Sequence, residues 1–480
     1  MRFRVVSYPV GWLFLFLGLS MIPSMAWSYY FNESAFPFIK AILVSIASGS
    51  SLILLGEKGE EFTPKEGFGV VAFGWLGCAA LGALPYYFSG FFEQYVDCFF
   101  ESMSGFTTTG ASILKDIEVL PKGILFWRDF THWLGGMGII VLSLAILPAL
   151  GVGGMHLFKA EVPGPVAEKI KPRVRETAKI LWEVYFIVSA AETILLYVGG
   201  MNLYEALCHT FGTVATGGFS PFNKSIGYYN NLYFEIVITA FMFIAGANFA
   251  LHYRALKGDL KGFIKDDEFR FYVGFVLVGV VFATVFLYLS GTYSNIGDSI
   301  RYASFQIVSI LTTTGYVTTD YSSWPPFVQY LLLILMFVGG CAGSTGGAMK
   351  HVRILILLKV FKKELYRLVH PEAVISIKLN GKPLHSNMVD SVLSFFMIYM
   401  LVFIVSSLVI AAMGYDLITS IASVAATLGN IGPGLGRVGP AENYAFFNPF
   451  AKWLLSFCMV AGRLELYAIL LIFLPETYRR

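Results

Sequence analysis

Apolar stretches about twenty residues long recur from one end of this chain to the other. A helix of that length crosses a hydrocarbon layer of roughly 30 Å. Only 14% of the 480 residues are charged and 56% are hydrophobic, whereas soluble proteins carry about 25% charged residues. The sequence therefore predicts an all-α polytopic membrane protein.

A short polar pattern ending in glycine interrupts the apolar sequence four times, roughly every hundred residues. The four copies are GFTTTGAS (105–112), TVATGGFS (213–220), ILTTTGYV (310–317) and TLGNIGPG (427–434). An apolar helix ending in glycine precedes each copy. A second apolar helix follows, with a Gly-Gly or Ala-Gly step ending at Gly136, Gly246, Gly340 and Gly462. We therefore expect four membrane–pore–membrane repeats.

The predicted boundaries place these repeats behind an N-terminal two-helix domain. They are 1–60 for the N-terminal pair, then 61–160, 161–265, 266–370 and 371–480 for the repeats. An N-terminal span from about 10 to 30 is too long for a signal peptide and is followed by a second span at 37–55, so we expect it to be retained. This organisation gives ten full crossings.

The distribution of lysine and arginine predicts the orientation. Most of the 34 such residues fall in the termini and in alternate connections, which include 156–179, 254–270 and 350–388. Because cytoplasmic segments carry the excess of positive charge, both termini are expected in the cytoplasm. All four repeats then run parallel, with their loops facing outward.

The loops have a composition suited to a cation. The segment 96–106 is too short to span the membrane, so it must enter and return, and irregular backbone at that depth has to line a cavity or be buried in protein. Its helix would end near Thr107 with the negative end of its dipole directed inward. A following glycine can turn carbonyl groups toward one axis, and four such loops would replace the hydration shell of a monovalent cation.

These motifs resemble the superfamily of potassium transporters that includes TrkH, TrkG, KtrB and the plant HKT proteins. The N-terminal pair, the stretch STGGAMK and the stretch GNIGPGLG look most like the TrkH branch, over nearly the full length. The resemblance implies a pseudo-fourfold pore with a K⁺ selectivity filter. Its residues would be Thr108, Thr109 and Gly110; Thr216, Gly217 and Gly218; Thr313, Thr314 and Gly315; and Asn430, Ile431 and Gly432. In the second loop, Gly218 is preferred over Gly217 as the final glycine by the family's AGF form. Glycine rather than serine at Gly110 favours potassium.

A glycine-rich segment interrupts the second helix of the third repeat. It contains the predicted gate residues Gly340, Gly343, Ser344, Thr345, Gly346 and Gly347. Each glycine weakens a helix by about 1 kcal/mol relative to alanine, so we expect a broken helix with a loop in the ion path. A phosphate-binding loop is excluded because Lys350 is not followed by serine or threonine. Glycine-mediated helix packing is the remaining alternative.

Arg463 is predicted about ten residues into the last span, where a charge costs roughly 2.5–3.5 kcal/mol. We expect it on the pore axis below the filter, beside the glycine-rich segment, and the family resemblance implies contact between the two. Glu465 is on another helix face and is not expected to be its partner. Asp129 and His132 are predicted at the membrane interface.

The sequence shows no nucleophile–base set and no metal-ligand spacing, so no enzyme activity is expected. The predicted function is channel-like K⁺ uptake across the inner (plasma) membrane. A Na⁺- or H⁺-coupled symporter and a non-conducting receptor or scaffold are the alternatives. The resemblance also implies a homodimer and a cytosolic, nucleotide-binding TrkA-type ring, for which 159–179, 254–270 and 350–382 are the candidate docking segments. The lipid bilayer is also an expected partner, and no nucleic acid is expected.

Overall fold

The computed structural model describes residues 1–58, 63–138, 174–373 and 375–478. These residues are mostly helical, and their sheet is a short antiparallel hairpin of β1 (Lys378–Leu379) and β2 (Lys382–Pro383). The structure confirms the predicted all-α membrane class. The predicted boundary at residue 160 and most of the basic segment 159–179 lie outside the described residues.

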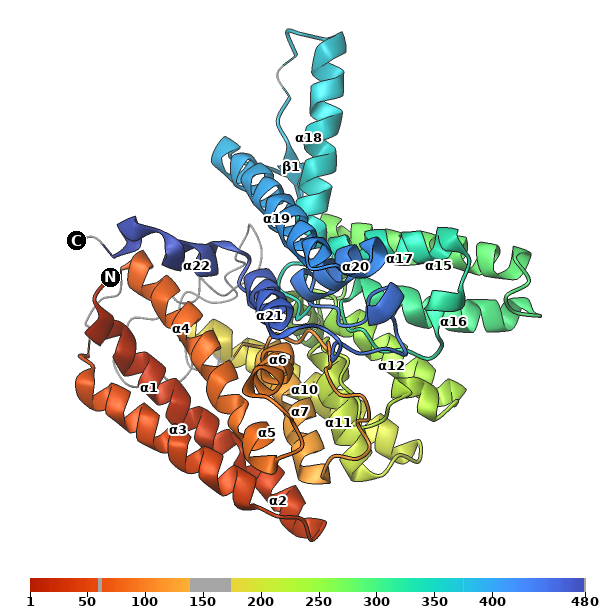
Figure 1. Cartoon of the computed structure of the whole chain (residues 1–480). Coiled ribbons are helices and arrows are strands. Elements are labelled where there is room, and N and C mark those ends of the chain that lie inside the picture. Colours follow the sequence, from red (N-terminus) through yellow and green to blue (C-terminus); the bar gives the residue numbers. More distant parts are fainter. Residues whose placement is uncertain (59–62, 139–173, 374, 479–480) are drawn as a thin grey trace.

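Three N-terminal helices form the two expected spans. They are α1 (Phe3–Ser20), α2 (Ile22–Tyr30) and α3 (Phe36–Leu55). The first two join into one apolar span of 28 residues, from Phe3 to Tyr30. This pair packs against the first repeat (Figure 1). There α1 contacts α4 (Pro64–Gly82), α3 contacts α4 and α5 (Leu84–Ser89), and α2 contacts α7 (Lys122–Gly136).

The first helix of each repeat is long and apolar. These helices are α4 (Pro64–Gly82) with its continuation α5 (Leu84–Ser89), α10 (Val174–Val198), α15 (Asp267–Leu289) and α19 (Ser386–Ala412). Together with the N-terminal pair they make six helices, within the described residues, that can cross a membrane by length and composition.

A short pore helix follows each first helix. The four are α6 (Tyr95–Phe106), α11 (Leu203–Val214), α16 (Ile296–Leu311) and α20 (Leu417–Leu428). Three of them begin at an asparagine or aspartate whose side chain accepts a hydrogen bond from the first turn: Asn202, Asn295 and Asp416. Such caps satisfy backbone groups that have no partner within the helix.

The second helices are shorter than predicted. They are α7 (Lys122–Gly136), α12 (Leu232–Ala245), α17 (Pro326–Val338) and α21 (Pro449–Arg463). Each ends within two residues of the aligned glycine, whereas the sequence analysis expected a break in the third repeat alone. Six helices qualify as spans by length and composition among the described residues, and the prediction of ten full crossings stays a prediction. Glycine weakens a helix at each of these positions.

The chain continues differently after the breaks in the second, third and fourth repeats. In the second repeat α13 (Phe249–Leu256) turns by 102° from α12. In the third, α18 (His351–Val369) projects from the body beside α19 (Figure 1). The other helices after the breaks are α14 (Lys261–Lys265) and α22 (Tyr467–Leu470). Short 3-10 helices lie at Ser225–Tyr228, Tyr321–Ser323, Gly436–Val438, Leu471–Phe473 and Pro475–Thr477.

The four repeats close into a ring. The second helix of each repeat packs on the pore helix of the next, as α7 does on α11, α12 on α16 and α17 on α20. The last helix, α21, returns to pore helix α6 of the first repeat. The cyclic order gives the pore its pseudo-fourfold arrangement.

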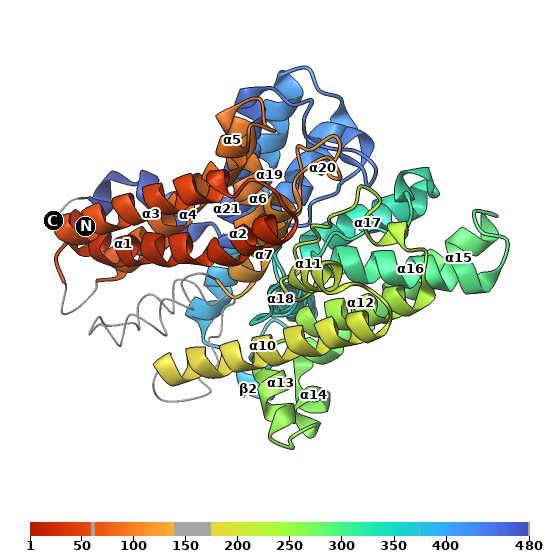
Figure 2. The same cartoon turned by 90° about the horizontal axis from the view of Figure 1, so that it is seen from below.

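The termini and two of the basic connections, all predicted on the cytoplasmic side, contact one another in pairs. The two termini are side by side in both views (Figures 1 and 2), and the Met1 amine donates a hydrogen bond of 3.0 Å to the Thr477 carbonyl. Two of the basic connections also meet, since Asn380 Nδ2 donates to Asp266 Oδ2 at 2.9 Å.

Candidate functional site

The four re-entrant loops, which we define as 107–112, 215–220, 312–317 and 429–434, share one backbone conformation. In each loop a residue with φ between 52° and 60° is followed two positions later by a glycine with φ between 78° and 95°. The pairs are Thr108 and Gly110, Thr216 and Gly218, Thr313 and Gly315, and Asn430 and Gly432. This left-handed region is one that glycine adopts at little cost. The structure therefore places Gly218, and not Gly217, at the position equivalent to Gly110.

Each of these four glycines lies against a carbonyl group of the next loop. A Cβ atom built on Gly110 would lie 2.1 Å from the Gly217 oxygen. The corresponding distances are 2.0 Å from Gly218 to the Thr314 oxygen, 1.9 Å from Gly315 to the Ile431 oxygen and 2.6 Å from Gly432 to the Thr109 oxygen. Atoms that close cannot coexist, so a side chain at any of these positions would displace the neighbouring loop. The contacts run around the ring in chain order, and the four loops meet at one axis.

Most threonine hydroxyl groups of the loops are buried and bonded to the protein, whereas Thr108 Oγ1 and Asn430 Oδ1 are buried without a hydrogen-bond partner among the described residues. The hydroxyl groups of Thr109 and Thr107 lie 2.8 Å apart, as do those of Thr314 and Thr312. Asn430 Nδ2 donates to Thr109 Oγ1 at 2.9 Å, which joins the fourth loop to the first. Backbone carbonyl oxygens are the atoms that each loop presents to the glycine of the preceding loop.

A buried ion pair supports the first two loops. Arg128 Nε donates to Glu101 Oε1 at 2.6 Å, and the second carboxylate oxygen of Glu101 accepts from the Ile113 amide at 3.0 Å. Arg128 also donates to the Ser220 carbonyl at 3.2 Å. Removing one partner of such a pair costs about 3–5 kcal/mol. Sequence analysis missed this pair, for which the available signal was an acidic residue in an apolar pore helix followed by an arginine in the next helix.

A cavity of about 120 Å³ opens on one side of the ring and is lined by all four loop glycines. The segment 339–350, which we call the glycine loop, lies on the other side. It contacts the ends of three pore helices. The contacts are the Gly347 amide to Thr313 Oγ1 at 2.7 Å, Thr345 Oγ1 to the Val214 carbonyl at 3.0 Å, and a Cβ position on Gly347 that lies 2.4 Å from the Gly429 carbonyl.

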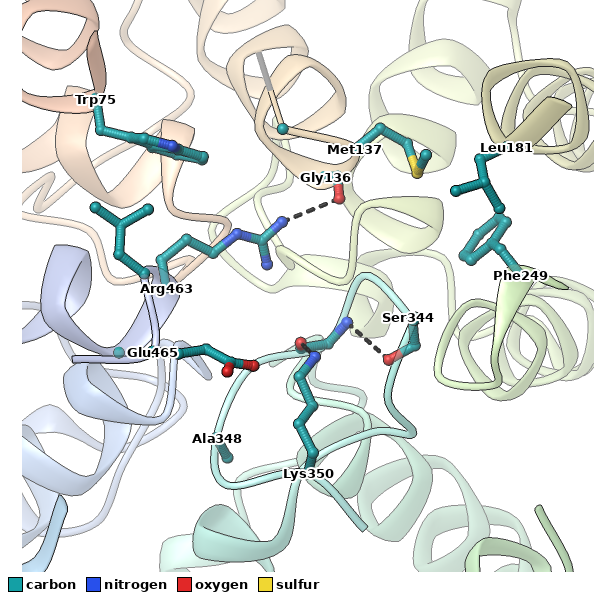
Figure 3. Close-up of a pocket in the computed structure, with 16 residues that line it drawn as sticks. Trp75, Gly136, Met137, Leu181, Phe249, Ser344, Ala348, Lys350, Arg463 and Glu465 are labelled. Atoms are coloured by element: carbon teal, nitrogen blue, oxygen red, sulfur yellow. Dashed lines mark hydrogen bonds between the residues drawn. The ribbon is translucent and has the colours of Figure 1, made fainter. Parts of the chain in front are cut away.

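Arg463 makes the contact with the remaining repeat. Its guanidinium donates to the Gly135 carbonyl at 2.7 Å and the Gly136 carbonyl at 3.0 Å, and also to the Thr345 carbonyl of the glycine loop at 2.7 Å. Figure 3 shows the side chain extended across the space between these elements. α21 ends at Arg463, so this residue lies at the end of a helix and not in its interior. The glycine loop and Arg463 together contact all four repeats.

The remaining predicted gate residues belong to the glycine loop and take part in its hydrogen bonds. The Gly343 carbonyl accepts from the Phe249 amide at 3.0 Å, and the Gly340 carbonyl accepts from the His351 amide at 3.0 Å. Ser344 Oγ donates to the Cys341 carbonyl at 2.6 Å and accepts from the Gly346 amide at 3.3 Å. These bonds explain why serine and threonine stand in the segment, which close helix packing alone would not.

A second cavity, of about 90 Å³, lies beside the glycine loop and is lined by Arg463, Glu465, Lys350 and Ser344 among others (Figure 3). Glu465 forms an ion pair with Arg353 of α18. Arg353 in turn lies 3.9 Å from the centre of the Phe395 ring. The helix that projects from the body is thus connected to the segment that carries Arg463.

Two predicted interfacial residues are in fact buried. Asp129 and His132 are both 0% exposed. They face the neighbouring pore helix because α7 packs on α11. Their prediction as interfacial residues is wrong.

Comparison with known proteins gives the family. A model of the TrkH family, described as cation transport protein, matches residues 34–477. The chain belongs to the TrkH family. It is therefore a multi-pass membrane transport protein and not an enzyme.

Relatives match this TrkH-family chain over nearly its full length. It is 44% identical to the Trk system potassium uptake protein TrkH of Escherichia coli K12, covering 100% of both chains. It is 36% identical to TrkG of the same strain, covering 98% of this chain and 97% of that protein. The crystal structure of the potassium transporter TrkH from Vibrio parahaemolyticus matches with a TM-score of 0.90 and 38% identity, over 100% of each chain.

Proposed function

We propose that the chain takes up K⁺ across the inner (plasma) membrane through a channel-like filter formed by the four re-entrant loops. The observation that carries the proposal is the closed ring in which each loop glycine lies against the next loop's carbonyl group. A ring of backbone oxygens can replace the hydration shell of a monovalent cation. The names of the relatives, which describe potassium uptake, support K⁺ as the transported ion.

The filter residues are those that the sequence analysis named, from Thr108 to Gly432. The pore helices support a cation site because each directs its C-terminal, partly negative end toward the ring. The membrane potential supplies about 2.3 kcal/mol per charge for every 100 mV. Inward movement of K⁺ then needs no chemical coupling.

In this proposal the glycine loop and Arg463 form the gate, and their contacts with all four repeats support a closed state. The glycine loop contacts three repeats and lies in the path of a cation that leaves the filter. The Arg463 guanidinium places a positive charge beside the first repeat. A cation leaving the filter would meet both. Conduction therefore requires the loop to leave the pore helices and Arg463 to leave the Gly135 carbonyl.

The chain is expected to work as a homodimer on a cytosolic TrkA-type ring, with both termini in the cytoplasm. The relatives' names describe a component of a Trk system, which supports a partner. The projecting α18 is suited to contact it because its end exposes Lys362 and Arg367. The neighbouring basic connection 254–270 joins the same side through Asn380 and Asp266.

The test is ion flux into liposomes that contain the purified chain. We expect K⁺ uptake that follows an imposed membrane potential, with no requirement for a Na⁺ or pH gradient. Strict dependence on either gradient would support the coupled symporter instead. Absence of flux in liposomes, together with no rescue of growth at low K⁺ in uptake-deficient cells, would favour a non-conducting protein.

The link between filter and gate can be tested at Thr313. Thr313→Val keeps the shape of the side chain but removes the oxygen that accepts from the Gly347 amide. Since a hydrogen bond of this kind contributes about 0.5–1.5 kcal/mol, we expect K⁺ flux through the chain alone to rise about threefold. Thr216→Val is the matched control, because its hydroxyl bonds only to the adjacent Ala215 carbonyl in the structure. Equal fluxes for the two variants would contradict the role of Thr313.

A further inference from the structure

The second re-entrant loop lacks a side chain where the other three have one. Gly217 stands at the position of Thr109, Thr314 and Ile431, directly before the left-handed glycine of its loop. A backbone without a side chain has more conformational freedom, and this loop also supplies the Gly217 carbonyl that contacts Gly110. The second quarter of the ring therefore needs support from elsewhere.

The imidazole of His132 occupies the missing side-chain position. A Cβ atom built on Gly217 would lie 2.3 Å from His132 Nδ1 and 2.5 Å from its Cγ. His132 is 0% exposed and comes from α7, the second helix of the first repeat. The ring thus fills the space that a threonine or isoleucine fills in the other loops.

His132 is held in place by an aromatic stack. Its ring lies parallel to that of Phe219, with centres 4.1 Å apart and planes 13° apart. The guanidinium of Arg128 lies 3.5 Å from the centre of the same Phe219 ring. The Phe219 amide donates to His132 Nδ1 at 3.4 Å. Because Arg128 is fixed by Glu101, this stack is anchored to the first pore helix.

The equivalent positions in the other repeats are apolar. Four residues before the aligned glycine of the second helix stand His132, Met242, Met336 and Cys458. Each second helix packs on the next pore helix, but Cys458 Sγ donates to Ser406 Oγ of α19 in its own repeat at 3.5 Å. The imidazole of His132 therefore occurs in the repeat whose following loop carries Gly217 in place of threonine or isoleucine.

We propose that His132 is a positioning residue of the filter, and that its imidazole replaces the side chain that Gly217 lacks. It holds the second loop through the contact with Gly217 and through the acceptor at Nδ1. It therefore fixes the carbonyl groups on both sides of Gly217, and with them the selectivity of the ring. This role rests on the proposed function of the ring as a K⁺ filter.

A double-mutant cycle tests the proposal. Gly217→Thr alone would collide with the imidazole, and His132→Ala alone would leave a void behind the loop. Each is expected to lower the K⁺ to Na⁺ permeability ratio of the full-length chain in liposomes. In the double variant the threonine side chain fills the void. The effects of contacting residues are coupled. We therefore expect the K⁺ to Na⁺ permeability ratio of the double variant to be at least about threefold higher than the two single effects together would give. Additive effects would overturn the proposal.

Two further variants separate the acceptor from the volume. His132→Asn keeps an acceptor near Nδ1 and should retain a higher permeability ratio than His132→Phe, which keeps the ring alone. Equal ratios for these two variants would overturn the role of the acceptor. Met242→Ala is the control for lost volume at an equivalent helix position, and it should lower the ratio less than His132→Ala.

Thermal unfolding of the purified variants makes the test independent of transport. The double variant should unfold at a higher temperature than either single variant, and a temperature below both would overturn the contact between His132 and Gly217. If Gly217→Thr alone yields no folded protein, its recovery in the double variant is the expected result, and its absence overturns the proposal. A wild-type chain that passes no K⁺ would remove the filter function while leaving this stability coupling intact.

Discussion

Gly110→Ser is expected to lower the permeability ratio of K⁺ to Na⁺ by about tenfold or more. The added Cβ atom would lie 2.1 Å from the Gly217 carbonyl oxygen, so the first and second loops must move apart. Overpacking of this kind costs about 1–3 kcal/mol, and a change of about 1.4 kcal/mol in relative barrier heights corresponds to a factor of ten. A widened ring coordinates K⁺ poorly and so loses its advantage over the smaller ion. Reversal potentials under bi-ionic conditions measure the ratio.

The control for Gly110→Ser is Gly90→Ser. Gly90 has φ of +75°, close to the +78° of Gly110, but a Cβ atom there would meet nothing within 4 Å. Both variants carry the cost of a left-handed serine, about 1–2 kcal/mol, whereas only Gly110→Ser displaces a neighbouring carbonyl. Comparable loss of selectivity in the two variants would mean that backbone strain, and not the ring contact, is responsible.

Arg463→Ala is expected to raise K⁺ flux through the chain alone by about tenfold or more. The substitution removes the hydrogen bonds to Gly135, Gly136 and Thr345, which hold the glycine loop against the first repeat. It also removes a positive charge from the path of a cation. Two charges 4 Å apart interact with about 4 kcal/mol at an effective dielectric constant of 20. Flux of Rb⁺ into liposomes measures the effect.

Two further variants show which part of Arg463 matters. Arg463→Lys keeps the charge but cannot donate to both sides with a planar fork, so it should raise flux less than alanine does. Arg4→Ala removes an arginine from an exposed pair with Glu57, far along α1 from the ring, and should leave flux unchanged. A flux for Arg463→Ala no higher than that of the wild type would remove the residue from the gate.

Much of the architecture could be predicted because a membrane span, and its repetition, can be recognised from a continuous stretch of apolar residues. The pore helix predicted over 96–106 lies at Tyr95–Phe106, and the two N-terminal spans were also found. The second helices were harder. Apolar composition continues through Gly136 and Gly246, and it does not reveal that the backbone turns there, since a glycine inside an apolar run is also compatible with a continuous helix.

The side-chain contacts of the site were less predictable. Placing Arg463 beside the glycine-rich segment followed from a charge that apolar surroundings cannot tolerate. The pairing of Glu101 with Arg128 depends on how two helices of the first repeat pack, and the stack of His132 on Phe219 depends on which helices become neighbours across repeats. Residue spacing within one helix gives no information on such contacts. His132 was therefore assigned to the interface, although α7 turns it toward the second loop.

The cyclic contact pattern has a consequence for how the four repeats can diverge. Each loop glycine is constrained by the carbonyl group of its successor, and each second helix supplies the wall behind the next pore loop. A substitution in one repeat is therefore compensated most directly in an adjacent repeat, as His132 illustrates for Gly217. Four repeats in contact in this way cannot change in sequence independently of one another. Differences between the repeats should therefore occur as pairs of matching substitutions in adjacent repeats.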